Sequence, residues 1–273
     1  MKQKLFDMAI APLTWMFRKA NAANVRFLQS ANPVFTIPVD GGSVRFFCPN
    51  DLTFWRARTL LTKEPDTISW IDSFAKDDVL YDIGANVGIY SVYAAVRGLK
   101  VFAFEPESQN YAVLNRNIYL NKIQDRVIAY NVAISDGKDT GYLNIRQLTA
   151  GAALNNFGEN VDYNKKTFEP VFKQAVLSYP LDLFIEEYRL PSPTHIKIDV
   201  DGLERLIVSG MSRTLAAASL KSVLIELNTK LDEDMEVVDI MSGYRFQVVS
   251  RFRAPEFDSS EYRYIYNFIF RRD

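Results

Sequence analysis

Cysteine and histidine are nearly absent from this sequence of 273 residues, which contains one of each, Cys48 and His195. A single cysteine excludes a disulfide within the chain, and the two residues together are too few for a zinc site built from these types alone. A site with oxygen ligands for Mg²⁺ or Ca²⁺ is not excluded, although no metal is expected. The low cysteine content fits a reducing compartment, and we expect the protein in the cytoplasm.

An excess of one sign of charge is also missing, since 32 lysines and arginines face 33 aspartates and glutamates. This balance argues against a broad nucleic-acid surface, and no nucleic-acid partner is expected. Hydrophobic residues make up 48% of the chain and charged residues 24%. Such a composition is typical of a folded domain with a substantial core.

A long hydrophobic run is the third missing feature. The apolar run at residues 8–17 is shorter than the roughly 20 residues needed to span a bilayer, and Pro12 interrupts it. Asp7 before this run and Arg18 after it argue against a cleaved signal peptide. The basic segment 1–28 is therefore interpreted either as a helix that covers a core or as a peripheral membrane contact.

Strands and helices alternate along most of the chain. Residues 33–48 predict two strands around an Asp-Gly-Gly turn, and residues 51–75 predict helices with one break. From Val79 onward, apolar strand-like runs alternate with helical patterns, which indicates an α/β fold with a doubly wound parallel sheet. We therefore divide the chain into an N-terminal extension of helices and a β-hairpin, residues 1–78, packed on a core domain, residues 79–273.

The later elements of the core domain include both regular and irregular stretches. The pattern predicts one third strand over residues 126–134 and one helix over residues 203–216. The polar span 149–168 predicts a long loop, and such loops often carry function. The last two strands, 245–252 and 262–272, follow each other through a short polar loop and are predicted to be antiparallel.

The turn after the first strand of the core domain, Asp-Ile-Gly-Ala-Asn-Val-Gly, lacks the dinucleotide pattern G-x-G-x-x-G and the P-loop pattern. Asn86 stands where the central glycine would let a pyrophosphate approach. Asp82 would repel a pyrophosphate and suits a cation, so a ligand with an ammonium, a carboxylate and an adenosine fits this turn. That ligand is S-adenosylmethionine, and the residues expected to hold it here are Asp82, Gly84, Ala85, Asn86, Gly88, Tyr90 and Ser91.

Glu105 supports the same ligand, because it ends the second strand, 23 residues after Asp82. An acid at this place accepts hydrogen bonds from the ribose hydroxyls. Pro106 follows it, and Ala133 and Ile134 near the end of the third strand are expected to pack on adenine. NAD enzymes share the ribose acid, so an NAD-dependent oxidoreductase is the alternative, although it lacks its glycine pattern. A non-catalytic relative that binds the cofactor or a glycan is a further alternative.

A second group of polar residues lies in the segment His-Ile-Lys-Ile-Asp-Val-Asp-Gly-Leu-Glu, residues 195–204. Period-two alternation places Lys197, Asp199 and Asp201 on one side of a strand, and Glu204 follows in the first turn of a helix. A transfer reaction with this ligand requires an aligned acceptor and removal of its proton. We expect these four residues to be catalytic, with Asp199 as the base or the orienting group. An ion pair between Lys197 and Glu204 is the structural alternative.

Asp199 has further interpretations. It is expected to contact the cofactor as well, and with Glu226 and Asn228 at the ends of adjacent strands it offers oxygen ligands for Mg²⁺. This metal site is the alternative, and a divalent metal is not expected. His195 begins its strand at the end opposite the cofactor and follows two nearby prolines, so we expect it at the surface rather than in catalysis.

The segments YDIGANVGIYS, AFEP, NVAISD, LSYPLD and HIKIDVDGLE together resemble the FkbM family of S-adenosylmethionine-dependent methyltransferases, from about Val79 to Asn228. The resemblance implies a class I methyltransferase fold, with a seven-stranded, mostly parallel sheet and an antiparallel last strand. It also implies O-methylation of a hydroxyl on a small-molecule acceptor, a glycan, a lipid-linked sugar or a natural product. The acceptor pocket is expected from the N-terminal extension and the loops 145–170 and 251–262. Candidates by position are Arg146, Asn155, Asn156 and Tyr163.

Overall fold

The computed structural model of the chain describes residues 22–272, and the chain divides into two compact units, residues 1–34 and 35–273. The described part of the first unit contains helix α2 (Ala22–Ser30). The second unit contains the sheets and the remaining helices. The boundary expected after residue 78 is not a limit of either unit, and it stays a prediction.

The sequence predicts either a core-covering helix or a peripheral membrane contact over residues 1–28. Residues 1–21 lie outside the described part of the chain, so this expectation stays a prediction. Over residues 22–272, the helices are too short or too polar to cross a membrane.

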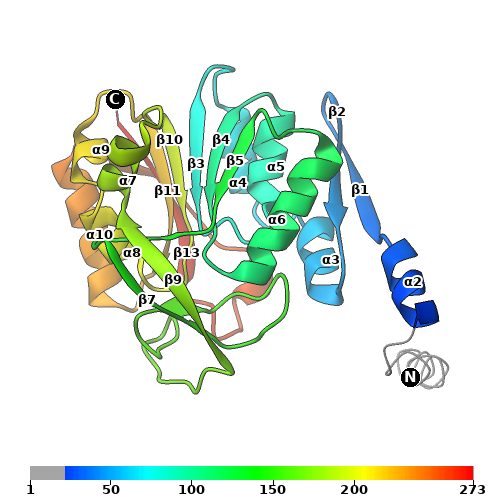
Figure 1. The fold of residues 1–273 in the computed structure, drawn as a ribbon. Helices are drawn as coiled ribbons and strands as arrows, with labels where there is room; N and C mark the ends of the chain where they lie inside the picture. The colour runs from blue at the N-terminus through cyan, green and yellow to red at the C-terminus, as the bar shows by residue number, and fades with distance from the viewer. Residues whose placement is uncertain (1–21, 273) are drawn as a thin grey trace. The chain divides into compact units, whose positions relative to one another are not determined.

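The predicted seven-stranded, mostly parallel sheet is confirmed, with the strand order β12-β13-β11-β10-β3-β4-β5. Strands β11, β10, β3, β4 and β5 pair in parallel, so they end at the same edge of the sheet (Figure 1). β13 pairs antiparallel with both of its neighbours. The strands are β3 (Val79–Ile83), β4 (Lys100–Phe104), β5 (Val127–Tyr130), β10 (His195–Ile198), β11 (Ser222–Asn228), β12 (Gln247–Phe252) and β13 (Ile265–Arg271).

Helices cover both faces of this sheet (Figure 1), which explains why its central strands are apolar almost without interruption. On β3, Leu80 packs in the core of one face, whereas Tyr81 and Ile83 pack in the core of the other. The first face packs against α3 (Asp51–Arg58), α4 (Pro65–Asp72), α5 (Ile89–Val96) and α6 (Ser108–Asn121). The second packs against α7 (Leu181–Tyr188), α8 (Glu204–Ser209), α9 (Ser212–Ala216) and α10 (Asp232–Gly243).

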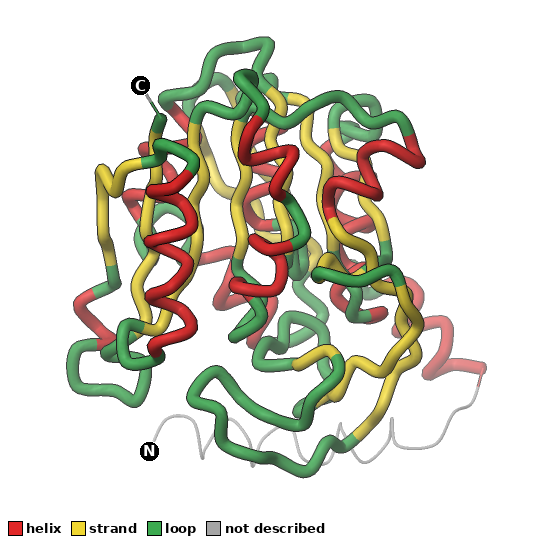
Figure 2. Tube along the Cα trace, turned by 90° about the vertical axis from the view of Figure 1, so that its left-hand side faces the viewer, coloured by secondary structure: helices red, strands yellow, loops and turns green. Residues whose placement is uncertain are grey.

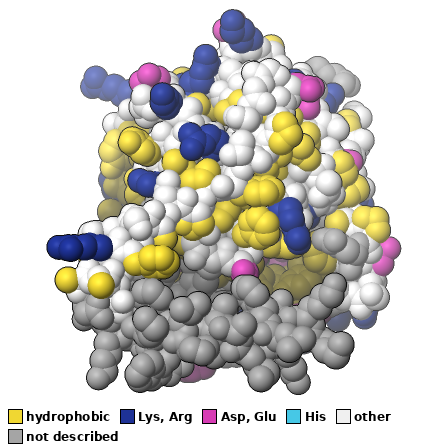
Figure 3. Space-filling model, turned by 90° about the vertical axis from the view of Figure 1, so that its right-hand side faces the viewer, with side chains coloured by type: hydrophobic (Ala, Val, Ile, Leu, Met, Phe, Trp, Pro, Cys, Tyr) yellow, Lys and Arg dark blue, Asp and Glu magenta, His cyan; other side chains and the backbone are white. Residues whose placement is uncertain are grey.

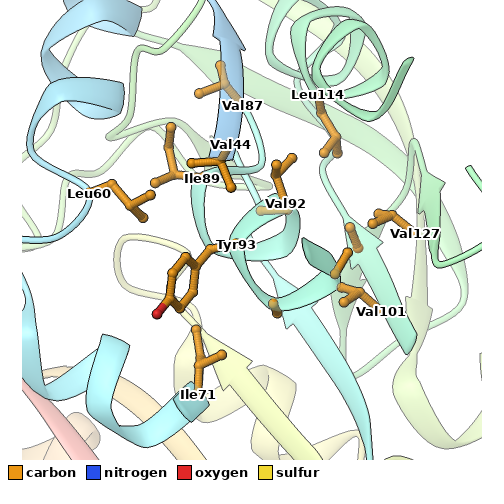
Figure 4. Packing of buried hydrophobic residues seen from close by; sticks show 14 of the residues in the cluster. Val44, Leu60, Ile71, Val87, Ile89, Val92, Tyr93, Val101, Leu114 and Val127 are labelled. Atoms are coloured by element: carbon orange, nitrogen blue, oxygen red, sulfur yellow. The ribbon is translucent and has the colours of Figure 1, made fainter. Parts of the chain in front are cut away.

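The hairpin β1 (Val34–Val39) and β2 (Gly42–Phe47) forms a separate two-stranded sheet. Figure 4 shows that Val44 of this hairpin and Ile71 of α4 lie in one cluster with Val92 of α5 and Val101 of β4. Each such fully buried side chain contributes about 1.5–3 kcal/mol. The segment before β3 therefore supplies part of the core beneath the sheet.

The prediction of one strand over residues 126–134 is wrong, because this segment forms two strands, β5 and β6 (Ala133–Ser135). β5 ends at Tyr130, and β6 belongs to a second sheet with the order β6-β9-β7-β8. At the break, the Asn131 amide donates to the carbonyl oxygens of Glu105 and Pro106, both at 2.9 Å. Figure 2 shows this second sheet and the long loops gathered beyond one end of the large sheet. Its other strands are β7 (Asp139–Ile145), β8 (Asn156–Phe157) and β9 (Phe172–Pro180).

The single helix predicted over residues 203–216 is also wrong, because it breaks at Gly210 into α8 and α9. A Cβ at Gly210 would lie 2.3 Å from the carbonyl oxygen of Ser135, so only glycine lets the helix approach β6 this closely. The carbonyl of Gly210 also accepts a hydrogen bond from the backbone N–H of Asp182 at 3.2 Å. Tertiary packing therefore overrides the helical pattern here.

The expected surface position of His195 is wrong. Its side chain is buried, stacks on Phe74 at a centroid distance of 3.5 Å, and lies at the start of β10. Nδ1 lies 2.6 Å from the Ser222 hydroxyl, and Nε2 lies 3.0 Å from the Asp78 carboxylate. Burial lowers the pKa of His195 to about 4, against the opposing effect of Asp78. The histidine is thus a neutral core residue far from the C-terminal strand ends.

Hydrophobic, basic and acidic side chains are interspersed on the described part of the face in Figure 3. This mixture agrees with the balance of charges in the sequence. Exposed hydrophobic side chains of this kind are normal for folded proteins and need no partner to explain them.

Candidate active site

The turn between β3 and α5 approaches the neighbouring strand closely. Gly84 has a φ of +79°, and a Cβ there would lie 1.9 Å from the carbonyl oxygen of Asp199, which follows β10. Asn86 also has a positive φ, +51°, and its backbone N–H donates to Oε2 of Glu105 at 2.7 Å. The Asn86 amide donates to the carbonyl of Ala152 at 2.9 Å. The turn therefore joins the ends of β10 and β4 to the long loop before β8.

Two adjoining cavities lie at this edge of the sheet, where the strand order reverses between β3 and β10. The small cavity has a volume of about 70 Å³ and the large cavity about 420 Å³. Open α/β sheets bind ligands at this place. The two cavities share the lining residues Gly84, Asn86, Ala152, Ala153, Asp199 and Asp201.

The small cavity is lined by many of the residues predicted to hold the cofactor. Those found in its lining are Gly84, Asn86, Glu105, Pro106, Ala133, Ile134 and Asp199. Phe157 of β8 and Leu143 of β7 complete its apolar wall, and Asn155 also lines it. Asn155, which was predicted to contact the acceptor, lines the small cavity instead.

Glu105 is buried at the end of β4, and backbone groups hold both of its carboxylate oxygens. Oε2 accepts from Asn86, and Oε1 accepts from the N–H of Glu107 at 2.9 Å. Burial raises the pKa of Glu105 to about 7, although these two N–H groups lower it. A carboxylate oxygen accepts more than one hydrogen bond, so Glu105 can also accept from a ligand hydroxyl.

The loop 147–154 lies at the boundary between the two cavities. Side chains from α3, α6 and the turn after β3 hold it. Asn110 of α6 donates to the carbonyl of Ala152 at 3.1 Å and accepts from the N–H of Gly151 at 2.7 Å. Arg56 of α3 donates to the carbonyl of Gly151 at 2.7 Å. These residues were missed from the sequence. A polar side chain on the buried face of a helix was the available signal for Asn110, which is 1% exposed.

The large cavity combines aromatic and charged groups. Trp55, Phe257 and Tyr262 provide aromatic surface, and Arg56 and Lys63 provide positive charge. Four carboxylates also line it: Glu64, Asp199, Asp201 and Glu226. The predicted N-terminal extension and the loop 251–262 therefore both contribute to this cavity, as does the loop 145–170.

Lys197 and Asp199 form an ion pair beside the cavities, with Nζ 2.7 Å from Oδ2. The lysine side chain is 3% exposed and the aspartate 29%. Burial opposes the charge of Lys197, but Asp199, Asp82 and Glu64 outweigh it and raise the lysine pKa. The alternative ion pair between Lys197 and Glu204 is wrong. Lys197 instead binds Asp199, which lines both cavities.

Glu204 and Asp201 hold the turn that follows β10. Glu204 is buried and accepts from the backbone N–H groups of Val200 at 3.2 Å and Gly202 at 2.9 Å. Asp201 has a positive φ, +64°, and accepts from the N–H of Leu154 at 2.6 Å. Burial and the charge of Asp199 raise the pKa of Asp201 to about 6. Asp201 lines both cavities, whereas Glu204 lines neither.

Glu226 near the end of β11 differs from the other carboxylates of the large cavity. Glu64, Asp199 and Asp201 each accept a hydrogen bond, whereas none to Glu226 is formed within residues 22–272. Burial and the charge of Asp199 raise its pKa well above the usual value. A carboxylate with a raised pKa binds a proton more tightly than an ordinary glutamate does. The sequence suggested Glu226 only as a metal ligand.

Of the three residues of the alternative metal site, Asp199 and Glu226 line the large cavity and Asn228 does not. The Asn228 amide donates to the carbonyl of Tyr163 at 3.0 Å, and its oxygen accepts from the N–H of Lys230 at 3.1 Å. The described side chains contain no group of three or more His, Cys, Asp or Glu residues placed to hold a metal ion. Asn228 is therefore a structural residue below the large cavity.

Several predicted cofactor residues lie in the wall of the site rather than in its lining. Asp82 is 1% exposed and accepts from the Ser91 hydroxyl at 2.5 Å, and its Oδ1 has no partner among the described residues. Burial raises the pKa of Asp82, while Lys197 lowers it. Tyr90 donates to Glu64 at 2.7 Å. The predicted residues absent from both cavity linings are Asp82, Ala85, Gly88, Tyr90, Ser91, Lys197 and Glu204.

The candidates Arg146, Asn156 and Tyr163 also lie outside both linings. Arg146 is 46% exposed and lies 3.8 Å from Asp162. Asn156 and Tyr163 are buried. Gln147, Ala153 and Leu154 of the same loop take the place expected for them at the large cavity.

A doubly wound sheet of this order, with its glycine turn, its strand-end acid and a ligand cavity between them, has the architecture of a class I methyltransferase. Comparison with protein families agrees, because residues 82–248 match the family described as the methyltransferase FkbM domain. The match covers more than half of the chain. The chain therefore belongs to the FkbM family of methyltransferases.

Two curated relatives are similar over most of their length. The hexuronic acid methyltransferase AglP of Haloferax volcanii is 24% identical over 71% of this chain and 74% of its own. The 31-O-demethyl-FK506 methyltransferase FkbM of Streptomyces tacrolimicus is 26% identical over 67% of this chain and 78% of its own. A crystal structure of a methyltransferase FkbM from Methylobacillus flagellatus aligns with a TM-score of 0.50 and 16% identity, over 72% of this chain and 44% of that one. That likeness concerns the fold.

Proposed function

We propose that the protein is an S-adenosylmethionine-dependent O-methyltransferase whose acceptor is a hydroxyl on a glycan, a lipid-linked sugar or a natural product. The observation that carries the proposal is the pair of adjoining cavities that share Asp199 and Asp201. One is lined for a nucleoside, and the other offers room for a second molecule. The similar proteins named above are a hexuronic acid and an FK506 methyltransferase, which supports a sugar or natural-product acceptor.

The small cavity fits the nucleoside part of S-adenosylmethionine. Glu105 would hold the ribose hydroxyls, and Ala133, Ile134 and Phe157 would pack on adenine. Asp199, which lines both cavities, offers carboxylate oxygens to a positively charged group at the junction. When bound, the cofactor supplies an electrophilic methyl group on a positively charged sulfur. A volume of about 70 Å³ is narrow for adenosine, so binding is expected to move the loop 147–154 outward.

The chain's own residues then align and deprotonate the acceptor. Trp55, Phe257 and Tyr262 offer flat surfaces that suit a sugar ring. Glu226, whose carboxylate has no hydrogen-bond partner in the described structure, takes the proton of the acceptor hydroxyl as that oxygen attacks. Lys197 is a positioning residue, because it fixes Asp199 from below the cavities.

Transfer of a labelled methyl group from S-adenosylmethionine to a panel of sugars, sugar acids and sugar nucleotides tests this function. We expect a labelled product that is stable to mild alkali, because a methyl ether resists hydrolysis. Alkali-labile label would indicate a methyl ester and a carboxylate acceptor instead. No transfer to any hydroxyl compound, together with no binding of S-adenosylhomocysteine, would contradict the proposal.

A further inference from the structure

A third cavity, here called the arginine cavity, lies beside the edge strand β12 and its neighbour β13 and has a volume of about 630 Å³. Arg251, Arg253 and Arg263 line it, and Asp258 is the one acid in its described lining. Three arginines against one aspartate leave an excess of two positive charges. The whole chain has a net charge of −1, so this concentration is local.

Aromatic rings rather than carboxylates contact the side chains of Arg251 and Arg263. The Arg251 guanidinium lies 3.9 Å from the centroid of the Tyr266 ring, and that of Arg263 lies 4.8 Å from the Tyr264 ring. Among the carboxylates whose side chains the structure describes, none lies within ion-pair distance of either arginine. Stacking on a ring uses the face of a guanidinium and leaves its N–H edge for a ligand.

Arg253 connects the arginine cavity to the active site, because it lines the large cavity as well. Its side chain is 17% exposed and pairs with Asp258, and it donates to the Tyr266 hydroxyl at 2.7 Å. Its Nε is buried and has no partner within the described part of the chain. The two cavities therefore lie on either side of one fixed cation, close enough for a single extended molecule to reach both.

We propose that the arginine cavity binds a phosphate or diphosphate group of the methyl acceptor while the acceptor's hydroxyl lies in the large cavity. This inference rests on the proposed function. Guanidinium groups match phosphate oxygens with two parallel hydrogen bonds, and several such groups around a shallow cavity suit a diphosphate. A phosphorylated sugar reaches such an enzyme either as a soluble sugar nucleotide or as a polyprenyl-linked sugar.

Calorimetric titration with inorganic pyrophosphate tests the subsite, because it needs no knowledge of the acceptor. The wild type should bind pyrophosphate, and the double variant Arg251→Gln/Arg263→Gln should bind it about tenfold or more weakly. Arg58→Gln is the matched control, since Arg58 also lies over a ring, that of Phe54 at 5.7 Å, but lines none of these cavities. Absence of pyrophosphate binding, or equal weakening in the control, would overturn the proposal.

S-adenosylhomocysteine binding separates this inference from the proposed function. The double variant should bind it as the wild type does, which also shows that the variant is folded. Loss of pyrophosphate binding with normal S-adenosylhomocysteine binding supports the subsite. Displacement of pyrophosphate by UDP-glucose indicates a sugar nucleotide, and displacement by undecaprenyl phosphate in detergent micelles indicates a lipid carrier. Displacement by neither would refute the link to the acceptor.

Discussion

Replacement of Glu105 by glutamine should change both the strength and the pH dependence of cofactor binding. Burial raises the pKa of this carboxyl to about 7. Ribose hydroxyls donate to its ionised form, so they favour deprotonation and the affinity should rise with pH. The ionised fraction grows from about 0.1 near pH 6 to about 0.9 near pH 8, which corresponds to a change of about tenfold in Kd. A glutamine does not titrate in this range and should abolish the change.

The assay is calorimetric titration of wild type and variants with S-adenosylhomocysteine between about pH 6 and about pH 8. Glu105→Gln should weaken binding about tenfold or more near pH 8, because a hydrogen bond to a charged group contributes about 1.5–3 kcal/mol. Glu107→Gln is the control. Glu107 accepts from Gln109 and Asn110 at the start of α6, so its loss should lower stability by about 1 kcal/mol. Its charge helps to raise the pKa of Glu105, so Glu107→Gln should keep the rise of affinity with pH but move it to lower pH. A flat wild-type profile, or one shared by Glu105→Gln, would refute the reasoning.

Three further predictions concern the core and the catalytic group. Gly84→Ala should destabilise the protein by more than about 2 kcal/mol in urea unfolding, because a left-handed residue costs about 1–2 kcal/mol and its Cβ meets the Asp199 backbone. Gly137→Ala is the control and should change the stability little, because a Cβ there has no atom within 4 Å. Equal losses of stability in the two variants would argue against this prediction. His195 has a folded pKa of about 4, below 6.5, so the unfolded chain binds the proton more tightly. Stability should therefore fall by up to about 3 kcal/mol as pH drops through this window. NMR of this single histidine should show no titration above about pH 5, and a titration midpoint near 6.5 would contradict the prediction. Glu226→Gln should lower turnover about 100-fold or more with an acceptor found in the screen, and leave S-adenosylhomocysteine binding intact. The exposed Glu169→Gln should leave both turnover and S-adenosylhomocysteine binding unchanged, and an active Glu226→Gln would exclude this base.

The large sheet and the glycine turn could be predicted because they depend on local patterns. Apolar runs separated by helical patterns define the parallel strands, and Gly84 and Glu105 fall at strand ends where ligands bind. The same logic found Pro106, Ala133 and Ile134, which line the small cavity. Asp199, also predicted as a site residue, lines both cavities.

The remaining features depend on contacts between distant segments. The break after Tyr130 results from hydrogen bonds of Asn131 to the end of β4, which no strand pattern contains. His195 is buried because Phe74 and Asp78 cover it from a different part of the chain. The large cavity is built from α3, the loop 147–154 and the segment after β12, none of which carries a motif.

Asp82 lies outside both cavity linings, although its place in the motif predicts a ligand contact. Its place at the end of β3 indicates a ligand for a positively charged group. In the structure, however, it is 1% exposed and is bound by Ser91. The carboxylate charge that reaches the cavities belongs to Asp199, held by Lys197. The sequence cannot decide which of two acids on neighbouring strands faces the ligand.

Parallel calorimetric titrations of the purified protein with S-adenosylmethionine, S-adenosylhomocysteine and NAD⁺ test the central claim most directly. The structure-based account predicts that the first two bind with micromolar affinity and that NAD⁺ does not bind. The turn around Asn86 and the acid Glu105 would then hold a nucleoside without a pyrophosphate. Binding of NAD⁺, with no binding of S-adenosylmethionine, would contradict the account and favour an oxidoreductase on the same fold.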